Sequence, residues 1–214
     1  MLELLLEKLI TIPLILICLT VHEFAHGFVA YKLGDTTAKE MGRLSLNPIR
    51  HIDWIGAFAM FFLGFGWAKP VPVNPYRFTK SGSRGIIWVS LAGPVSNLVL
   101  AFITIIVYGV LCYTAPSAVM NEWVYTILIT FASLNVGLAV FNLIPIPPLD
   151  GSKVLMYFLP YNAKCRMEQS QNMLFMLLML ASFSGVLGRI IGPVMRFLLT
   201  GMAQIVDLVL GLIF

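Results

Sequence analysis

Charge is scarce in this chain of 214 residues. Only 11% of the residues are Asp, Glu, Lys or Arg, whereas a soluble domain has about 25%, and 59% of the residues are apolar. A water-soluble globule could not bury so much apolar side chain, and a disordered segment needs the opposite composition. The composition therefore predicts a single integral membrane domain over residues 1–214, with lipid as its main solvent.

Long stretches lack charge altogether, and each could cross a hydrocarbon core, which takes about 20 apolar residues. Three runs contain no charged residue: 85–121, 123–149 and 169–188. Residues 9–31 form a further span that is interrupted by one acid, Glu23, and residues 192–214 form a weaker one. A signal peptide is not expected, because Glu3 and Glu7 disrupt a basic n-region.

The stretch between the first two spans is unusual. Residues 42–48 look extended, residues 55–66 are apolar but too short to span, and residues 67–78 alternate around three prolines. We expect short edge strands that flank a re-entrant or interfacial segment, with an unstructured cytoplasmic loop as the alternative. The predicted fold is therefore an all-α polytopic membrane protein with about 4–6 transmembrane helices and a short β-strand or re-entrant element. Its core covers residues 9–155, and further helices cover residues 156–214.

Basic residues lie between the spans. They are frequent in residues 32–84 and 153–166 and absent from residues 114–122. By the positive-inside rule, the first and third loops face the cytoplasm and the second loop faces outward. The net charge of +4 therefore reflects membrane topology, and a nucleic-acid partner is not expected. The three cysteines show no Cys-x-x-Cys spacing and predict no disulfide framework.

The first span carries the sequence His22-Glu23-Phe24-Ala25-His26. On a helix, residues four apart face the same side, so the two imidazoles can share one zinc ion while Glu23 accepts a proton from water. Ionisable groups in a span cost several kcal/mol unless they are paired or metal-bound. This pattern therefore favours a zinc site over accidental polar residues.

A third zinc ligand has to come from elsewhere. The extended motif of soluble metalloproteases would need Gly and His where Val29 and Lys32 stand. Nearer polar residues, Glu40, His51 and Asp53, are expected to be solvated loop residues rather than ligands. Asp150 is the better candidate, because it follows a proline-rich helix end at the same depth as the histidines. A simple turn at this Asp-Gly pair is the alternative.

The paired motifs resemble the site-2 protease family of intramembrane zinc metalloproteases. The resemblance rests on the His-Glu-x-x-His motif, on Gly93-Pro94-Val95-Ser96-Asn97, on residues 68–74 and on the Asn-x-x-Pro-x-x-x-Leu-Asp-Gly pattern that ends at Gly151. Trp54 departs from it, since proline is expected there. The chain resembles the minimal form of the family, without PDZ or CBS domains.

The resemblance implies specific roles. It implies one Zn²⁺ per chain with His22, His26 and Asp150 as ligands, and Glu23 as the catalytic base. Asn142 and Asn97 become candidate substrate or oxyanion groups, with helix packing or an interhelical hydrogen bond as the alternative.

The implied activity is hydrolysis of peptide bonds in or near the transmembrane segments of membrane proteins, as in regulated intramembrane proteolysis. The expected location is a bacterial or archaeal cell membrane, with the active site near the cytoplasmic side. A zinc transporter, a non-catalytic metal-binding membrane protein and a structural subunit are the alternatives. The sequence leaves open the substrate and whether the chain forms a homo-oligomer.

Overall fold

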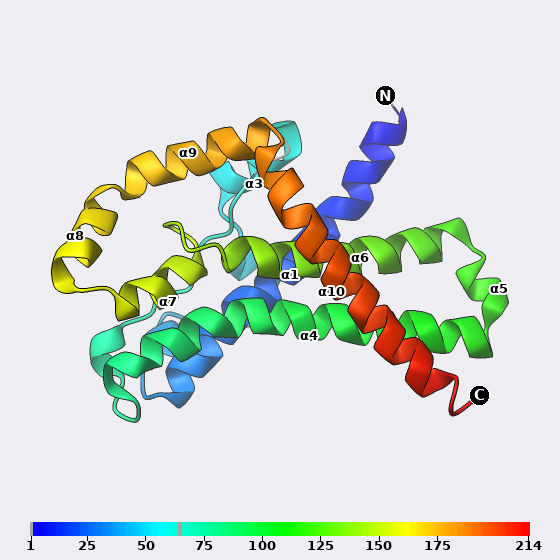
Figure 1. Cartoon of the computed structure of the whole chain (residues 1–214), viewed down its shortest axis with the longest axis horizontal. Coiled ribbons are helices and arrows are strands. Elements are labelled where there is room, and N and C mark those ends of the chain that lie inside the picture. The colour runs from blue at the N-terminus through cyan, green and yellow to red at the C-terminus, as the bar shows by residue number, and fades with distance from the viewer. Residues whose placement is uncertain (1, 64–65) are drawn as a thin grey trace. The chain divides into compact units, whose positions relative to one another are not determined.

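A computed structural model describes residues 2–63 and 66–214 of the chain (Figure 1). The chain forms two compact units. The first comprises Met1–Ser96 and Lys153–Leu159, and the second comprises Asn97–Ser152 and Pro160–Phe214. Within the described residues the regular structure is helical, and the sole strand-type pairing is an isolated antiparallel bridge between Ile52 and Ala68. The expected all-α architecture is confirmed, and the expected short edge strands are not.

The first unit begins with α1 (Leu2–Lys32), which continues into a short helix and a series of turns. Its remaining elements are α2 (Thr37–Glu40), η1 (Pro48–His51), α3 (Trp54–Leu63), η2 (Pro75–Arg77), η3 (Gly82–Arg84), the first turns of α4 (Gly85–Thr114) and most of α7 (Asp150–Phe158). Ala30 of α1 packs with Phe78 and Val89 in a buried apolar cluster. The apolar segment predicted over residues 55–66 coincides largely with α3, and its residues 64–65 lie outside the described residues.

The second unit is built around α4, α6 and α10. Its elements are the rest of α4, α5 (Pro116–Val119), α6 (Glu122–Asn142), α8 (Tyr161–Gln169), α9 (Gln171–Phe183) and α10 (Val186–Leu210). Helix α10 packs against both α6 and α9. Its residues Val206 and Leu210 join Ile105 and Ala132 in a buried apolar cluster, which fixes the C-terminal helix to its neighbours.

Four described helices are long and apolar enough to cross a membrane: Lys8–Lys32, Gly82–Thr114, Glu122–Asn142 and Val186–Leu210. The first three agree with the predicted spans. The charge-free run 169–188 is not one long helix, because Gly185 adopts φ +74° and α9 has only 13 residues, or about 20 Å. The last span starts earlier than predicted, because α10 continues through Arg189, which the charge count treated as a boundary.

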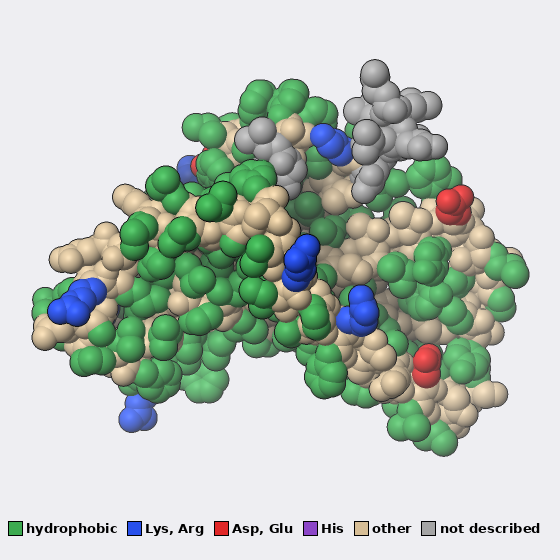
Figure 2. All heavy atoms as spheres, turned by 45° about the horizontal axis from the view of Figure 1, so that its top comes forward, with side chains coloured by type: hydrophobic (Ala, Val, Ile, Leu, Met, Phe, Trp, Pro, Cys, Tyr) green, Lys and Arg blue, Asp and Glu red, His purple; other side chains and the backbone are tan. Residues whose placement is uncertain are grey.

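Large apolar side chains remain exposed on α3 and on the long helices. Trp54 is 74% exposed, Trp88 62% and Phe197 77%. Figure 2 shows hydrophobic side chains over much of the visible face, with few charged ones among them. Such exposure would be unfavourable in water and is what a lipid-facing surface requires. The chain is therefore an integral membrane protein.

Asp35 ties the end of α1 to the proline-rich segment that precedes η2. Its side chain is fully buried and accepts hydrogen bonds from the backbone N–H and hydroxyl of Thr37, and from the backbone N–H of Asn74 at 2.6 Å. Burial alone would raise the pKa of Asp35. The hydrogen bonds and the nearby Arg77 charge outweigh burial, so the pKa lies below the value of an ordinary aspartate.

Replacing Asp35 with Asn should lower the melting temperature of the detergent-solubilised protein, because the amide group cannot accept from all of these donors. A buried donor left without an acceptor costs about 1–3 kcal/mol. Folding lowers the pKa of Asp35, so the ionised carboxylate stabilises the folded protein in full at pH values above its pKa in the unfolded chain, about 3.9. This stabilisation fades as the pH falls toward the pKa of Asp35 in the folded protein. The difference between wild type and D35N should therefore be steady from pH 7 to 5 and shrink below pH 4.

The matched control is Glu40→Gln, which alters an exposed carboxylate on the neighbouring helix α2. Glu40 pairs with Arg77 at 2.9 Å, but both side chains are about half exposed, so little change in melting temperature is expected. Equal melting temperatures for D35N and wild type at pH 7 would contradict the assigned role of Asp35.

Candidate metal centre

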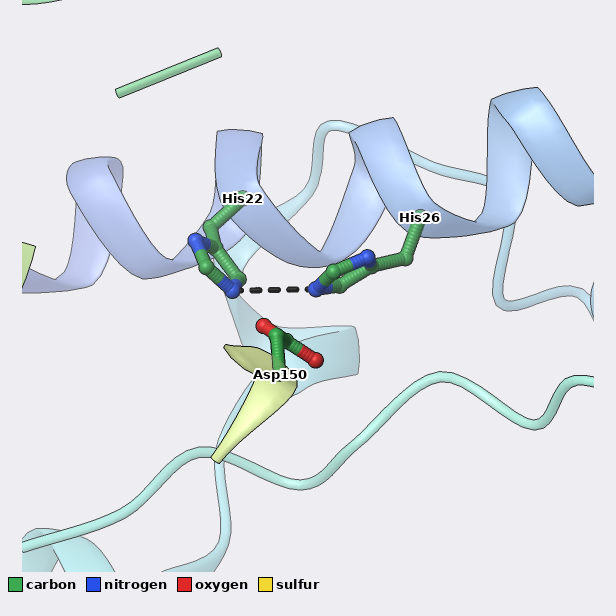
Figure 3. A group of neighbouring side chains, drawn as sticks. All are labelled: His22, His26 and Asp150. Atoms are coloured by element: carbon green, nitrogen blue, oxygen red, sulfur yellow. Dashed lines mark hydrogen bonds between the residues drawn. The ribbon is translucent and has the colours of Figure 1, made fainter. Parts of the chain in front are cut away.

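His22 and His26 lie on successive turns of α1, and their rings meet edge to face. Four residues make just over one helical turn, so both side chains project from the same side of the helix. Their Nε2 atoms are 3.0 Å apart, and both residues are buried, with 3% and 7% of their surface exposed. Figure 3 shows the two imidazoles turned toward each other from α1. The predicted pair of ligands is therefore brought together.

A backbone carbonyl fixes which nitrogen of His26 is available. Nδ1 of His26 lies 2.6 Å from the carbonyl oxygen of Val89 on α4. A carbonyl only accepts hydrogen bonds, so Nδ1 carries the proton and donates it to Val89. In a neutral imidazole the other nitrogen, Nε2, then keeps its lone pair, which is the form that binds a metal.

The donor pair fits zinc. Zinc–nitrogen bonds of 2.0–2.1 Å in a tetrahedral site place two nitrogen ligands about 3.3 Å apart, close to the 3.0 Å between the two Nε2 atoms. Gly93 of α4 leaves room beside them. A Cβ added there would lie 2.5 Å from Nε2 of both His22 and His26. The absence of a side chain at this one position keeps the space next to the two nitrogens open.

Glu23 follows His22 directly and has a partner that the sequence motifs did not reveal. Its Oε2 accepts a hydrogen bond from the backbone N–H of Val71 at 2.7 Å. A backbone group carries no side-chain signature, although the flanking Pro70 and Pro72 do mark Val71 as the lone amide donor of that tripeptide. The structure therefore joins the proline-rich segment to the carboxylate of the motif.

Asp150, Asn142 and Asn97 belong to the second unit. Asp150 is the first residue of α7 and is buried, so that His22, His26 and Asp150 are all buried and are of types that could hold a metal ion. The three prolines that follow α6 separate its end at Asn142 from the start of α7, as the sequence indicates. The backbone of Leu143 approaches Gly151 so closely that no Cβ would fit at that glycine.

The two asparagines make helix contacts in the second unit. Nδ2 of Asn97 on α4 donates to Oδ1 of Asn135 on α6 at 2.8 Å, and both residues are fully buried. This is the interhelical hydrogen bond considered for Asn97. Nδ2 of Asn142 donates to the carbonyl of Leu138 within α6 at 2.9 Å. A substrate role for either residue stays a prediction.

The polar loop residues that were expected not to be ligands have other partners. Glu40 pairs with Arg77 at the surface. Asp53 accepts from backbone N–H groups at the start of α3 and so caps that helix. His51 is buried, and its Nε2 donates to the carbonyl of Ser45 at 2.7 Å. These contacts are structural.

Comparisons with known proteins agree on one family. A family model described as peptidase family M50 matches residues 109–185, which include Asp150. The chain is 43% identical over 164 residues to "Putative zinc metalloprotease YwhC" of Bacillus subtilis, an alignment that covers 74% of this chain and 73% of the relative. No solved structure matches the chain.

Two mycobacterial relatives named in the same way as YwhC are more distant. Rip2 of Mycolicibacterium smegmatis is 32% identical over 64% of this chain and 52% of its own length. Rip2 of Mycobacterium tuberculosis is 33% identical over 65% of this chain and 53% of its own length. The chain thus matches about half the length of these two proteins.

Replacing Gly93 with Ala should weaken zinc binding about tenfold or more, because the new methyl group would displace the imidazoles from their positions. The measurement is zinc content by elemental analysis after dialysis against graded chelator. Gly192→Ala is the matched control, since that helical glycine has open space around it and alanine is the better helix former. Equal zinc retention by G93A and G192A would contradict the tight packing inferred at Gly93.

Proposed function

This chain belongs to peptidase family M50, the site-2 protease family of zinc metallopeptidases, and from that premise we propose that it hydrolyses peptide bonds in or near the transmembrane segments of membrane proteins. One observation carries the proposal. A helix apolar enough to span a membrane holds two buried imidazoles 3.0 Å apart, with a carboxylate at the intervening Glu23. Zinc is the cofactor, and the site lies on a span.

We propose that Asp150 completes the ligand set with His22 and His26. Its support is its residue type, its burial and its place after a proline-rich break that follows a predicted span. A buried carboxylate in a membrane protein is costly unless it is paired or bound to a metal. Three protein ligands are typical of catalytic zinc sites, which keep a further position open.

Bound zinc supplies Lewis-acid activation of water and of the scissile carbonyl. The chain's own residues do the rest. Glu23 holds Oε2 against the Val71 amide and takes the proton of the attacking water at Oε1. It then passes that proton to the leaving amine. The carbonyl of Val89 keeps the proton of His26 on Nδ1 throughout.

The proposed substrates are transmembrane proteins or peptides, because the histidines lie within a helix long and apolar enough to span a membrane. We place the active site near the cytoplasmic side, where the basic residues of the first and third loops are expected. Helix α3 is the proposed re-entrant or interfacial element. Its length of 10 residues is too short to span, yet Phe58 and Phe62 are more than half exposed, as a lipid contact requires.

The first test replaces Glu23 with Gln and assays cleavage of single-span substrates by purified protein in detergent. We expect wild type to cleave and E23Q to lose detectable cleavage while keeping its zinc, because the amide cannot accept the proton but leaves the ligands in place. A chelator should abolish wild-type cleavage, and added zinc should restore it. Zinc flux in liposomes without any cleavage would instead favour a transporter.

The second test concerns the third ligand. Replacing Asp150 with Ala should lower zinc affinity beyond the about 10–100-fold range that loss of an outer-shell partner causes. Asp207→Ala removes an exposed acid of α10 and is the control, with wild-type affinity and one zinc per chain expected. Full zinc retention by D150A would exclude Asp150 as a ligand.

A further inference from the structure

The tripeptide Pro70-Val71-Pro72, here called the 70–72 arm, presents a single backbone N–H. Proline has no amide hydrogen, so Val71 supplies the sole amide donor of the arm. Although the arm lies outside regular secondary structure, Val71 is 8% exposed. Its N–H donates to Oε2 of Glu23 at 2.7 Å. The single backbone N–H of the arm thus donates its hydrogen bond to the carboxylate of the His-Glu-x-x-His motif.

The sequence of the arm limits how Val71 can move. The ring of Pro70 locks its own φ near −65°, and a residue before proline, here Val71, is restricted to extended conformations. The branched Val71 side chain is also stiff at χ1. The amide therefore loses little conformational entropy when it points at Glu23.

Neighbouring contacts anchor the arm on both sides. At its start, the N–H of Lys69 donates to the carbonyl of His51 at 2.9 Å, and the Arg43 guanidinium donates to the carbonyls of Lys69 and Pro70 at 2.6 and 3.2 Å. After it, the N–H of Asn74 donates to the buried Asp35 carboxylate. The position of the Val71 amide is thus fixed by hydrogen bonds on both sides of it.

Helix α1 is shaped to receive the arm. A Cβ added at Gly27 would lie 3.1 Å from Cγ1 of Val71, which is tighter than an ordinary contact. Gly27 is four residues after Glu23, so the two lie on the same side of α1. The glycine lets the arm approach the helix at the point where the amide meets the carboxylate.

We propose that the Val71 backbone amide is a positioning group for the base Glu23. A glutamate side chain has three rotatable bonds, and the amide holds one carboxylate oxygen so that the other is presented to the attacking water. This inference rests on the proposed function, in which Glu23 is the base. It assigns the 70–72 arm a role in catalysis in addition to its packing against α1.

The decisive pair of variants is Val71→Pro and Val71→Ala. V71P removes the N–H, whereas V71A trims the same side chain and keeps the N–H. We expect kcat of V71P to fall about 10–100-fold below that of V71A, with KM and zinc content equal in the two variants, because only the orientation of the base is lost. A purely structural role would instead change zinc content, melting temperature or KM.

A second measurement reads the hydrogen bond without any catalysis. In protein labelled with ¹⁵N-valine, the Val71 amide proton should shift upfield and exchange faster in Glu23→Ala than in wild type, because its acceptor is gone. Identical spectra would overturn the inference. Should V71P fail to fold, this comparison alone decides.

The outcomes separate the two claims. Turnover by V71P equal to that of V71A, with active wild type and inactive E23Q, would overturn the positioning role and leave the proposed function intact. Absence of cleavage by wild type would defeat the proposed function, and with it the catalytic purpose of the arm. Lower kcat in V71P together with the amide shift would support both.

Discussion

A bilayer offers no water to a buried polar group, so every such group on a spanning helix needs a partner inside the protein. On helix α1, the polar groups that need such partners include His22, Glu23 and His26. The carbonyl of Val89 satisfies one nitrogen of His26, and the Val71 amide satisfies one oxygen of Glu23. The Nε2 atoms of His22 and His26 lie 3.0 Å apart, close enough for one metal ion to bind both.

The same demand explains why the proline-rich segment lies against α1. Two carboxylates, Glu23 on the helix and Asp35 just beyond its end, each accept from a backbone amide of that segment, at Val71 and Asn74. Because no sheet forms there among the described residues, side-chain acceptors take the place that neighbouring strands would fill. The proline-rich segment thereby donates a backbone hydrogen bond to each of the two acids.

Much of this could be predicted from sequence, because composition and helical spacing act locally. Two charge-free runs and the apolar stretch around Glu23 located three of the four long helices, and the four-residue spacing placed the two histidines on one side of α1. Counting charges failed where Arg189 lies inside α10 and where Gly185 breaks an apolar run. Charge marks a helix end only when the membrane boundary coincides with it.

Contacts made by the backbone were beyond sequence reasoning. Every residue has a backbone carbonyl, so no pattern singles out that of Val89. Pro70 and Pro72 leave Val71 as the lone amide donor between them, but nothing in the sequence identifies Glu23 as its acceptor. Alternation around prolines suggested an extended conformation over residues 67–78 but also strands, because it specifies the local shape and not the partner. Gly93 stood in a motif, yet its closeness to the imidazoles depends on how α4 packs against α1.

That packing links metal affinity to the mechanics of the membrane. Since Gly93 and the Val89 carbonyl both lie against the histidines from the first half of α4, any change that separates α4 from α1 alters the positions of the two imidazoles and the space beside them. By thermodynamic linkage, a zinc ion bound by both imidazoles would in turn favour the packed arrangement of the two helices. Bilayer thickness, lateral pressure or the choice of detergent would then change zinc occupancy, and the zinc content of a preparation would report on the packing of α4 against α1.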